Sequence, residues 1–284
     1  MSLAPDFVVQ KRGATWITIR RSLAQDSMID MMANADFFFG LPGCEIIKDQ
    51  RKIKVARVKL AIEGQTRTVY LKRYNAFSWR YRLSSLFQRS GAARALTGAT
   101  LLAEAGVGTA RPLAAMESRC CGMLTKSFFL SEEIAGGKTA DSYWRDKLSA
   151  CSGSVGVHRR RRFLRDLGVL FALLHRKRIY HNDLKDANII VAARDGEREG
   201  LFLLDLEGLR TGKVLSLRRR VKNLVQLNRT FGKNISATQK LYVLRSYLGR
   251  DFLDDDKRKA WVYRILEGSR RGDRRSLRKM KRAA

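Results

Sequence analysis

Residues 181–188 read HNDLKDAN and place a histidine, two aspartates, a lysine and two asparagines within eight positions. Asn188 directly precedes the apolar run IIVAA, and Asp205 closes a second run, LFLL, beyond a polar stretch that contains Asp195-Gly196. Two apolar runs around such a turn predict a β-hairpin. Because antiparallel pairing sets the start of one strand beside the end of the other, we expect Asn188 and Asp205 at the same end of this hairpin.

An amide and a carboxylate oxygen at one place suit Mg²⁺, which completes its octahedron with water and substrate phosphates. Asp183 lies five residues before Asn188 on the connecting loop, where its carboxylate would orient an attacking hydroxyl group. Phosphoryl transfer needs such a base, charge neutralisation around the phosphates and a lysine that holds the nucleotide. The spacing therefore favours phosphotransferase chemistry.

Three motifs in order resemble those of protein kinases. HNDLKDAN satisfies the catalytic-loop pattern H-x-D-L-x-x-x-N, VYLK at 69–72 resembles the third-strand V-A-I-K, and DLEG at 205–208 stands where D-F-G is expected. This resemblance implies an α+β, bilobal protein-kinase-like fold. Its small β-rich N-terminal lobe would span residues 1–126, and its larger helical lobe would span residues 127–284.

The segments YLKRYN, LLAEAGVGTARPLA and NLVQLNRTF look similar to the lipopolysaccharide kinases of Gram-negative bacteria, which phosphorylate Kdo or heptose sugars of the inner core. That resemblance implies ATP and Mg²⁺ as cofactors, with Lys72 on the α- and β-phosphates and Asp183 as the catalytic base. Asn188 and Asp205 would bind the metal. Lys185, two residues after the base, would approach the transferred phosphate.

The chain departs from the kinase pattern at two places. The glycine-rich phosphate loop is absent, since the turn after CEIIK reads DQRK, and side chains of Lys48, Arg51 or Lys52 would replace the glycine amides. The helix acid that pairs with the strand lysine is also missing: Ala95 stands at its expected place, and the only acid of that helix, Glu104, lies near its end. Glu104 is therefore our candidate from this helix for the nucleotide site.

Other polar residues have simpler interpretations. Glu207 is an alternative metal ligand to Asp205, but the D-x-x-G pattern favours Asp205. His181 is expected to brace the loop rather than take part in the chemistry. His158 and His175 show no partners in the sequence and are expected at the surface or at helix ends.

Hydrophobic periodicity predicts the elements that must position these residues. Residues 44–74 read as an antiparallel meander of three strands, and residues 111–129 as two more strands. Apolar residues at helical spacing predict further helices over residues 90–105, 163–175, 218–231, 236–248 and 256–268. A strand-rich lobe followed by a helical lobe results, with a basic tail over residues 269–284.

The chain is strongly basic, with 57 Lys and Arg against 27 Asp and Glu, which implies a polyanionic partner. A lipopolysaccharide core or similar anionic glycolipid and an anionic membrane surface both fit, and charge alone does not separate them from nucleic acid. The start MSLAPDFVVQKRG lacks a signal-peptide core, and the four cysteines form no metal-binding pattern. We expect a cytoplasmic protein with reduced cysteines, held peripherally at the inner face of the inner membrane.

Three functions remain open at this point. The first is an ATP- and Mg²⁺-dependent kinase of lipopolysaccharide core sugars. The second is a kinase acting on a protein or another small molecule, although the short segment after Asp205, without A-P-E, counts against a peptide substrate. The third is a non-catalytic kinase-fold binding protein; the presence of Lys72, Asp183, Asn188 and Asp205 together counts against it.

Overall fold

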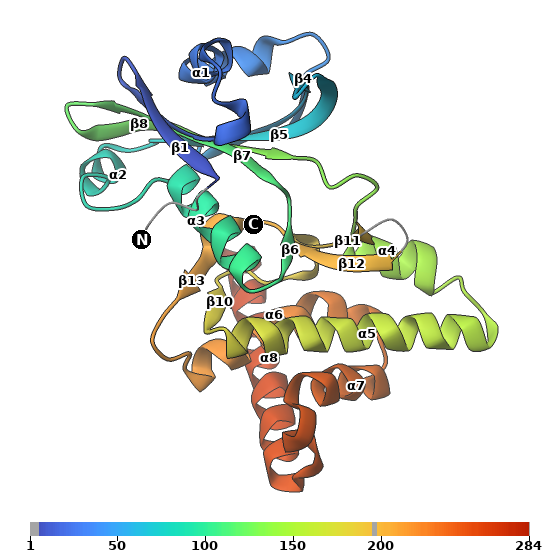
Figure 1. Ribbon diagram of the computed structural model, residues 1–284. Coiled ribbons are helices and arrows are strands. Elements are labelled where there is room, and N and C mark those ends of the chain that lie inside the picture. Colours follow the sequence, from blue (N-terminus) through green and yellow to red (C-terminus); the bar gives the residue numbers. More distant parts are fainter. Residues whose placement is uncertain (1–5, 195–197, 284) are drawn as a thin grey trace. The chain divides into compact units, whose positions relative to one another are not determined.

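The computed structural model describes residues 6–194 and 198–283, so the predicted turn at Asp195-Gly196 lies outside the described residues (Figure 1). The chain forms two compact units. The first contains the residues up to 103, 109–135 and 206–208, and the second contains 104–108, 136–205 and the residues from 209 onward. A β-rich N-terminal part and a helical C-terminal part confirm the expected α+β class. The predicted boundary between residues 126 and 127 falls inside a strand of the first unit.

The first unit is built on a seven-stranded antiparallel sheet in the order β1-β2-β7-β8-β5-β4-β3. Its strands are β1 (Phe7–Arg12), β2 (Thr15–Arg20), β3 (Glu45–Gln50), β4 (Ile53–Ile62), β5 (Gln65–Asn75), β7 (Pro112–Cys120) and β8 (Met123–Glu132). The predicted meander is confirmed as β3 to β5, and the predicted strand pair is confirmed as β7 and β8. The hairpin of β1 and β2 was not predicted.

Helices complete the first unit. The helix α1 (Asp26–Ala33) and the following 3₁₀ turn (Ala35–Gly40) pack against the sheet and close an apolar core. The largest fully buried side chains of this core are Ile17, Ile19, Met32, Phe38, Ile62, Leu71, Leu113, Met116 and Phe128. The predicted helix is confirmed as α3 (Gly91–Glu104), preceded by the short α2 (Trp79–Ser84). Gly91 lies so close to the Tyr74 ring that a Cβ atom there would be 2.5 Å from it, which fixes α3 against β5.

The second unit is mainly helical. Its helices are α4 (Ala140–Tyr143), α5 (Gly153–Arg176), α6 (Leu217–Thr230), α7 (Ala237–Leu248) and α8 (Asp255–Ala283). A small sheet in the order β6-β12-β11-β9 and the pair β10-β13 lie among them. These strands are β6 (Gly108–Thr109), β9 (Lys138–Thr139), β10 (Ile179–His181), β11 (Ile189–Arg194), β12 (Arg198–Leu203) and β13 (Leu209–Thr211). All helices predicted for this part are confirmed, and α7 begins with the expected Ser236–Gln239 capping box.

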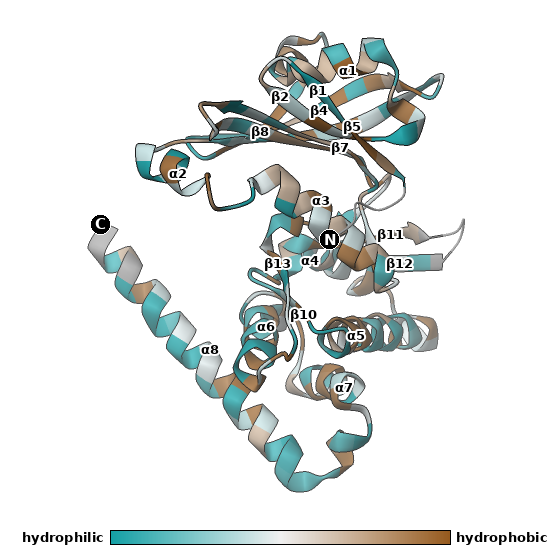
Figure 2. Cartoon of the chain, turned by 60° about the vertical axis from the view of Figure 1, so that its left-hand side comes forward, coloured by the Kyte–Doolittle hydropathy of each residue, from teal (hydrophilic) through white to brown (hydrophobic). Residues whose placement is uncertain are grey.

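The last helix is longer than predicted, because the expected basic tail continues α8 to Ala283. Gly268 and Gly272 do not end this helix, and both lie where it contacts α6. A Cβ atom at Gly268 would lie 2.7 Å from Val225, and one at Gly272 would lie 2.6 Å from Arg229, so both glycines let α8 approach α6. Figure 2 shows α8 as predominantly hydrophilic. No helix among the described residues has the length and hydrophobicity to cross a bilayer.

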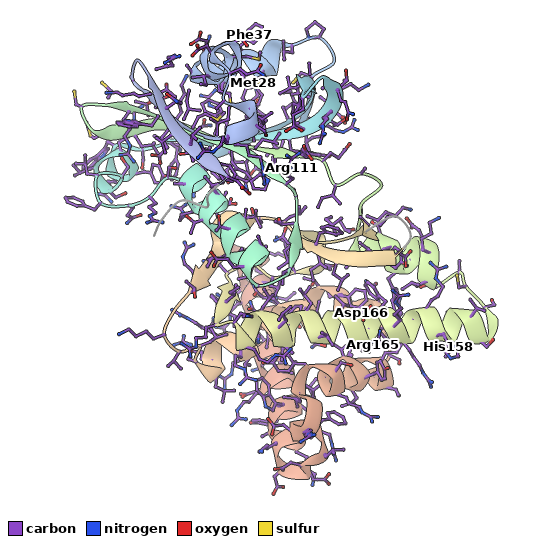
Figure 3. The ribbon with its side chains drawn as sticks, viewed as in Figure 1. Met28, Phe37, Arg111, His158, Arg165 and Asp166 are labelled. Carbon is purple, nitrogen blue, oxygen red and sulfur yellow. The ribbon has the colours of Figure 1, made fainter. Side chains whose placement is uncertain are left out.

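A buried polar chain joins three helices of the second unit. The Nδ1 of His175, at the end of α5, lies 2.9 Å from the Tyr247 hydroxyl of α7, and its Nε2 lies 3.2 Å from the Oδ1 of Asn223 on α6. Since the amide oxygen can only accept, Nε2 carries a proton. His175 thus lies at a helix end, as expected, but it is buried and has two partners that the sequence did not show. His158 is exposed, as expected (Figure 3).

Acid should weaken the fold through His175. Burial lowers its pKa to about 4, below the ordinary value of about 6.5. Between these two pKa values, His175 of the unfolded chain binds a proton, whereas His175 of the folded chain does not. This contribution to stability is complete above the unfolded pKa and is lost as the pH falls toward the folded one. We expect the free energy of unfolding to drop by roughly 2 kcal/mol more between pH 7 and pH 5 in the wild type than in His175→Gln.

Urea unfolding at a series of pH values measures this difference. The matched control is His158→Gln, which removes an exposed histidine and should retain the wild-type pH dependence. Parallel pH profiles for the wild type and His175→Gln would contradict the expectation.

Candidate active site

The catalytic-loop motif begins at the end of β10, where His181 is completely buried. The backbone N–H of Asp183 donates to the Nδ1 of His181 at 3.1 Å, so the other ring nitrogen carries the proton and donates to the carbonyl of Leu204 at 3.0 Å. One imidazole thus links the loop to the end of β12. This is the bracing role expected from the sequence.

The hairpin brings Asn188 and Asp205 to one end, as predicted. Ile189 pairs with Leu203, and the backbone N–H of Leu204 donates to the carbonyl of Asn188 at 2.9 Å. The Asn188 side-chain nitrogen donates to the carbonyl of Asp183 at 2.7 Å, which leaves the amide oxygen as the possible metal ligand. Asp205 has a positive φ of 60°, a conformation that non-glycine residues adopt mainly at turns and functional sites.

Asp183 and Lys185 lie side by side in the loop. The Nζ of Lys185 is 2.7 Å from the Oδ2 of Asp183, and both side chains are close to half exposed. The Asp183 carboxylate is therefore accessible from solvent and lies beside the ammonium group of Lys185.

Two side chains of α6 that the sequence analysis did not single out also hold this loop. The Nδ2 of Asn223 donates to the carbonyl of His181 at 2.6 Å, and the Nε2 of Gln226 donates to the carbonyl of Asn182 at 2.9 Å. Asn223 and Gln226 are three residues apart and so share one face of the helix. Their presence in NLVQLNRTF was the available signal, because two amides on the inward face of a basic helix need polar partners.

Lys72, in the first unit, is held by an acid that was expected in another role. Its Nζ lies 2.5 Å from the Oε1 of Glu207, and the two side chains are only 19% and 16% exposed. Glu207 belongs to the 3₁₀ turn Leu206–Gly208, which is part of the same unit as β5. Glu207, weighed from the sequence as an alternative metal ligand, therefore forms an ion pair with Lys72.

The helix α3 explains how this turn approaches. A Cβ atom at Gly98 would lie 2.4 Å from the backbone oxygen of Leu206, so only glycine allows the contact at this position. Ala95, at the place where a helix acid was expected, is buried. Glu104 is exposed at the end of α3 and makes no ion pair within the described part of the chain, so its place in the nucleotide site stays a prediction.

The three cations predicted to replace the glycine loop lie along the hairpin of β3 and β4. Lys48 is on the exposed strand β3, opposite Val55, while Arg51 and Lys52 form the turn. The Nζ of Lys52 lies 4.8 Å from the centre of the Phe77 ring, and an Arg51 nitrogen donates to the Phe77 carbonyl at 3.5 Å. Contact of these cations with a nucleotide stays a prediction.

The donor set of the second unit fits Mg²⁺. Asn188 supplies an amide oxygen and Asp205 a carboxylate at the same end of the hairpin. Magnesium commonly takes one or two protein carboxylates and fills its other positions with water and phosphate oxygens. Within residues 6–194 and 198–283, no cluster of three or more His, Cys, Asp or Glu offers a self-sufficient metal site. The chemistry therefore suits a metal that arrives together with a phosphate ligand.

Comparisons with known proteins identify the family and a similar fold. The model of the lipopolysaccharide kinase (Kdo/WaaP) family matches residues 47–247, which is more than half of the chain. The fold is similar to that of a solved structure of WaaP in complex with acyl carrier protein, with a TM-score of 0.62 and 17% sequence identity over 87% of this chain and 97% of that chain. A search of curated proteins finds no match. Acyl carrier protein, the partner in the WaaP structure, is not among the partners expected from this sequence.

The ion pair of Lys72 and Glu207 should contribute measurably to stability. Because both side chains are largely buried, their attraction is weakly screened by solvent, and removing one partner takes that attraction away. A double-mutant cycle with Lys72→Met and Glu207→Gln should give a coupling energy of about 1–3 kcal/mol in chemical unfolding. The exposed pair of Arg12 and Asp26 is the control and should give less than about 1 kcal/mol. Additive effects of the two buried substitutions would show that the pair is not formed in solution.

Proposed function

The chain belongs to the lipopolysaccharide kinase (Kdo/WaaP) family, and we propose that it transfers the γ-phosphate of ATP, with Mg²⁺, to a heptose or Kdo hydroxyl group of the lipopolysaccharide inner core. The observation that carries this proposal is the arrangement at the end of the β11–β12 hairpin. There the base, the two oxygen ligands and the lysine beside the base are tied into one loop by backbone pairing and by His181.

Asp183 is the group that would receive the proton of the sugar hydroxyl. Its backbone position is fixed from both sides, since its N–H is bound by His181 and its carbonyl by Asn188. Only the side chain of Asp183 can still change its position, and this limited freedom favours a well-oriented attack by the sugar hydroxyl group. The neighbouring ammonium group of Lys185 would exchange its contact with Asp183 for one with the transferred phosphate.

Asn188 and Asp205 would hold Mg²⁺, which when bound neutralises charge on the phosphate oxygens. Lys72 would hold the α- and β-phosphates, and its pairing with Glu207 keeps the ammonium group oriented without a helix acid. Lys48, Arg51 and Lys52 would supply further positive charge to the phosphates. These assignments join the observed positions of the side chains to the requirements of phosphoryl transfer.

The acceptor is proposed to be a sugar of the anionic glycolipid rather than a protein or nucleic acid. The family membership favours the lipopolysaccharide core, and a formal net charge of +30 suits a phosphorylated glycolipid at an anionic leaflet. We accordingly place the protein in the cytoplasm, peripherally bound at the inner membrane.

Loss of the base should abolish transfer. With labelled ATP, Mg²⁺ and purified lipopolysaccharide that lacks core phosphate, Asp183→Asn should be about 10²- to 10⁴-fold slower than the wild type. Asp205→Ala should be similarly inactive because it removes the only carboxylate of the proposed metal pair. The control Asp186→Asn makes the same change of charge in the same loop and should stay active.

Thermal unfolding establishes that each variant is folded. Full transfer by Asp183→Asn would refute the assignment of the base. Label that appears on a protein or a small molecule but never on lipopolysaccharide would favour the second candidate function. Absence of transfer from folded wild-type protein to every acceptor would favour a binding protein.

A further inference from the structure

Between β5 and α3 the first unit carries a short segment, residues 77–89, that is firmly anchored at its backbone (Figure 1). The side chain of Ser78 caps the start of α2. The hydroxyl of Ser85 is buried and accepts the backbone N–H of Leu124 in β8 at 2.8 Å, and a guanidinium nitrogen of Arg119 in β7 donates to the Ser85 carbonyl at 3.2 Å. The side chains of this segment are thus displayed from a fixed support.

Most large apolar side chains of the segment face solvent. Trp79 is 69% exposed, Leu83 50%, Leu86 45% and Phe87 89%, and α2 buries none of its six residues. Isolated exposed apolar residues are ordinary, but a cluster of four within nine positions marks an interaction surface.

The charges around this cluster are of one sign. Arg80, Arg82 and Arg89 are exposed and alternate with the apolar residues, and the chain carries no acidic residue between Glu63 and Glu104. The acid that borders the adjoining groove, Glu117, lies 3.7 Å from Arg119 and is paired with it. A partner that has an apolar interior beneath a negatively charged surface is complementary to this segment.

We propose that residues 77–89 bind a lipid bilayer with anionic headgroups. The rings of Trp79 and Phe87 would enter the boundary between headgroups and acyl chains, where aromatic side chains are favoured. The three exposed arginines would contact lipid phosphates. The exposed side chains that form this surface are different from the residues assigned to the proposed transfer reaction.

The helix α8 is the alternative site of membrane contact, and its chemistry differs. It carries many cations, but Arg271 pairs with Glu267, and Asp273 of the same helix pairs with Arg229 at 2.9 Å. Attraction between the remaining exposed cations and anionic lipid is screened by salt. Insertion of aromatic rings is not screened, so membrane binding that persists at high salt distinguishes the 77–89 segment from α8.

The experiment measures sedimentation of the full chain with phosphatidylcholine vesicles containing phosphatidylglycerol, across a range of salt concentrations. Each buried ring should account for about a tenfold change in partitioning, so Trp79→Ser/Phe87→Ser should reduce high-salt binding by about 100-fold. Replacing Arg80, Arg82 and Arg89 with Gln should weaken low-salt binding to the mixed vesicles and leave binding to pure phosphatidylcholine unchanged.

The matched control is Phe37→Ser/Leu253→Ser, which removes two apolar side chains of 56% and 76% exposure outside the segment and should bind like the wild type (Figure 3 labels Phe37). All substituted side chains are exposed, so unchanged thermal unfolding midpoints are expected. Equal vesicle binding by Trp79→Ser/Phe87→Ser and the control would overturn the proposal. So would a change of oligomeric state in light scattering without a change in vesicle binding, since the segment would then cover a second copy of the chain.

Discussion

The ion pair between a largely buried lysine and a carboxylate is the interaction on which the first unit depends. Lys72 lies on β5 between β4 and β8, with about four-fifths of its side chain removed from solvent. The helix beside this strand offers no acid among its buried residues. The required charge comes instead from Glu207, 135 positions along the chain, and Gly98 provides the space for its turn. The absence of a side chain at Gly98 and the carboxylate of Glu207 together make the ion pair with Lys72 possible.

The second unit meets a different requirement, which is to hold a polar loop without exposing its backbone to competing water. Almost every backbone group around the motif has a defined partner: His181 and Asn188 bind the loop from within, and Asn223 and Gln226 bind it from α6. Asn223 also contacts His175, so the loop is connected through buried hydrogen bonds to α5 and α7. Such connected networks specify one geometry more strongly than separate bonds do.

Local patterns in the sequence were enough to predict the hairpin, the loop and most helices. The two apolar runs that became β11 and β12 determine which residues meet at the hairpin end, and their antiparallel pairing was correctly expected. The partner of Lys72 was not predictable in this way, because no local pattern links two residues so far apart. The partners of His175 were not predictable for the same reason, since they come from two later helices.

The predicted end of the last helix was wrong because of a glycine. Gly268 was read as the end of a helix, whereas it supports close packing of α8 on α6 and the helix continues. The hairpin of β1 and β2 was missed because each strand covers only six positions and β1, FVVQKR, does not alternate apolar with polar residues. The helix α1 was missed as well, and it has only eight residues. Such short elements become stable only once they cover the core of the larger sheet.

The turn that follows Asp205 has a consequence for control of the enzyme. In a kinase whose lysine is paired to a helix, moving that helix breaks the pair and leaves the metal ligand in place. Here the acid that pairs with Lys72 lies in the short 3₁₀ turn Leu206–Gly208, directly after the proposed metal ligand in the chain. Displacement of this turn would take Glu207 away from Lys72, so the position of the turn determines the orientation of the lysine. An effector or inhibitor that enters between Gly98 and Leu206 would act on this ion pair.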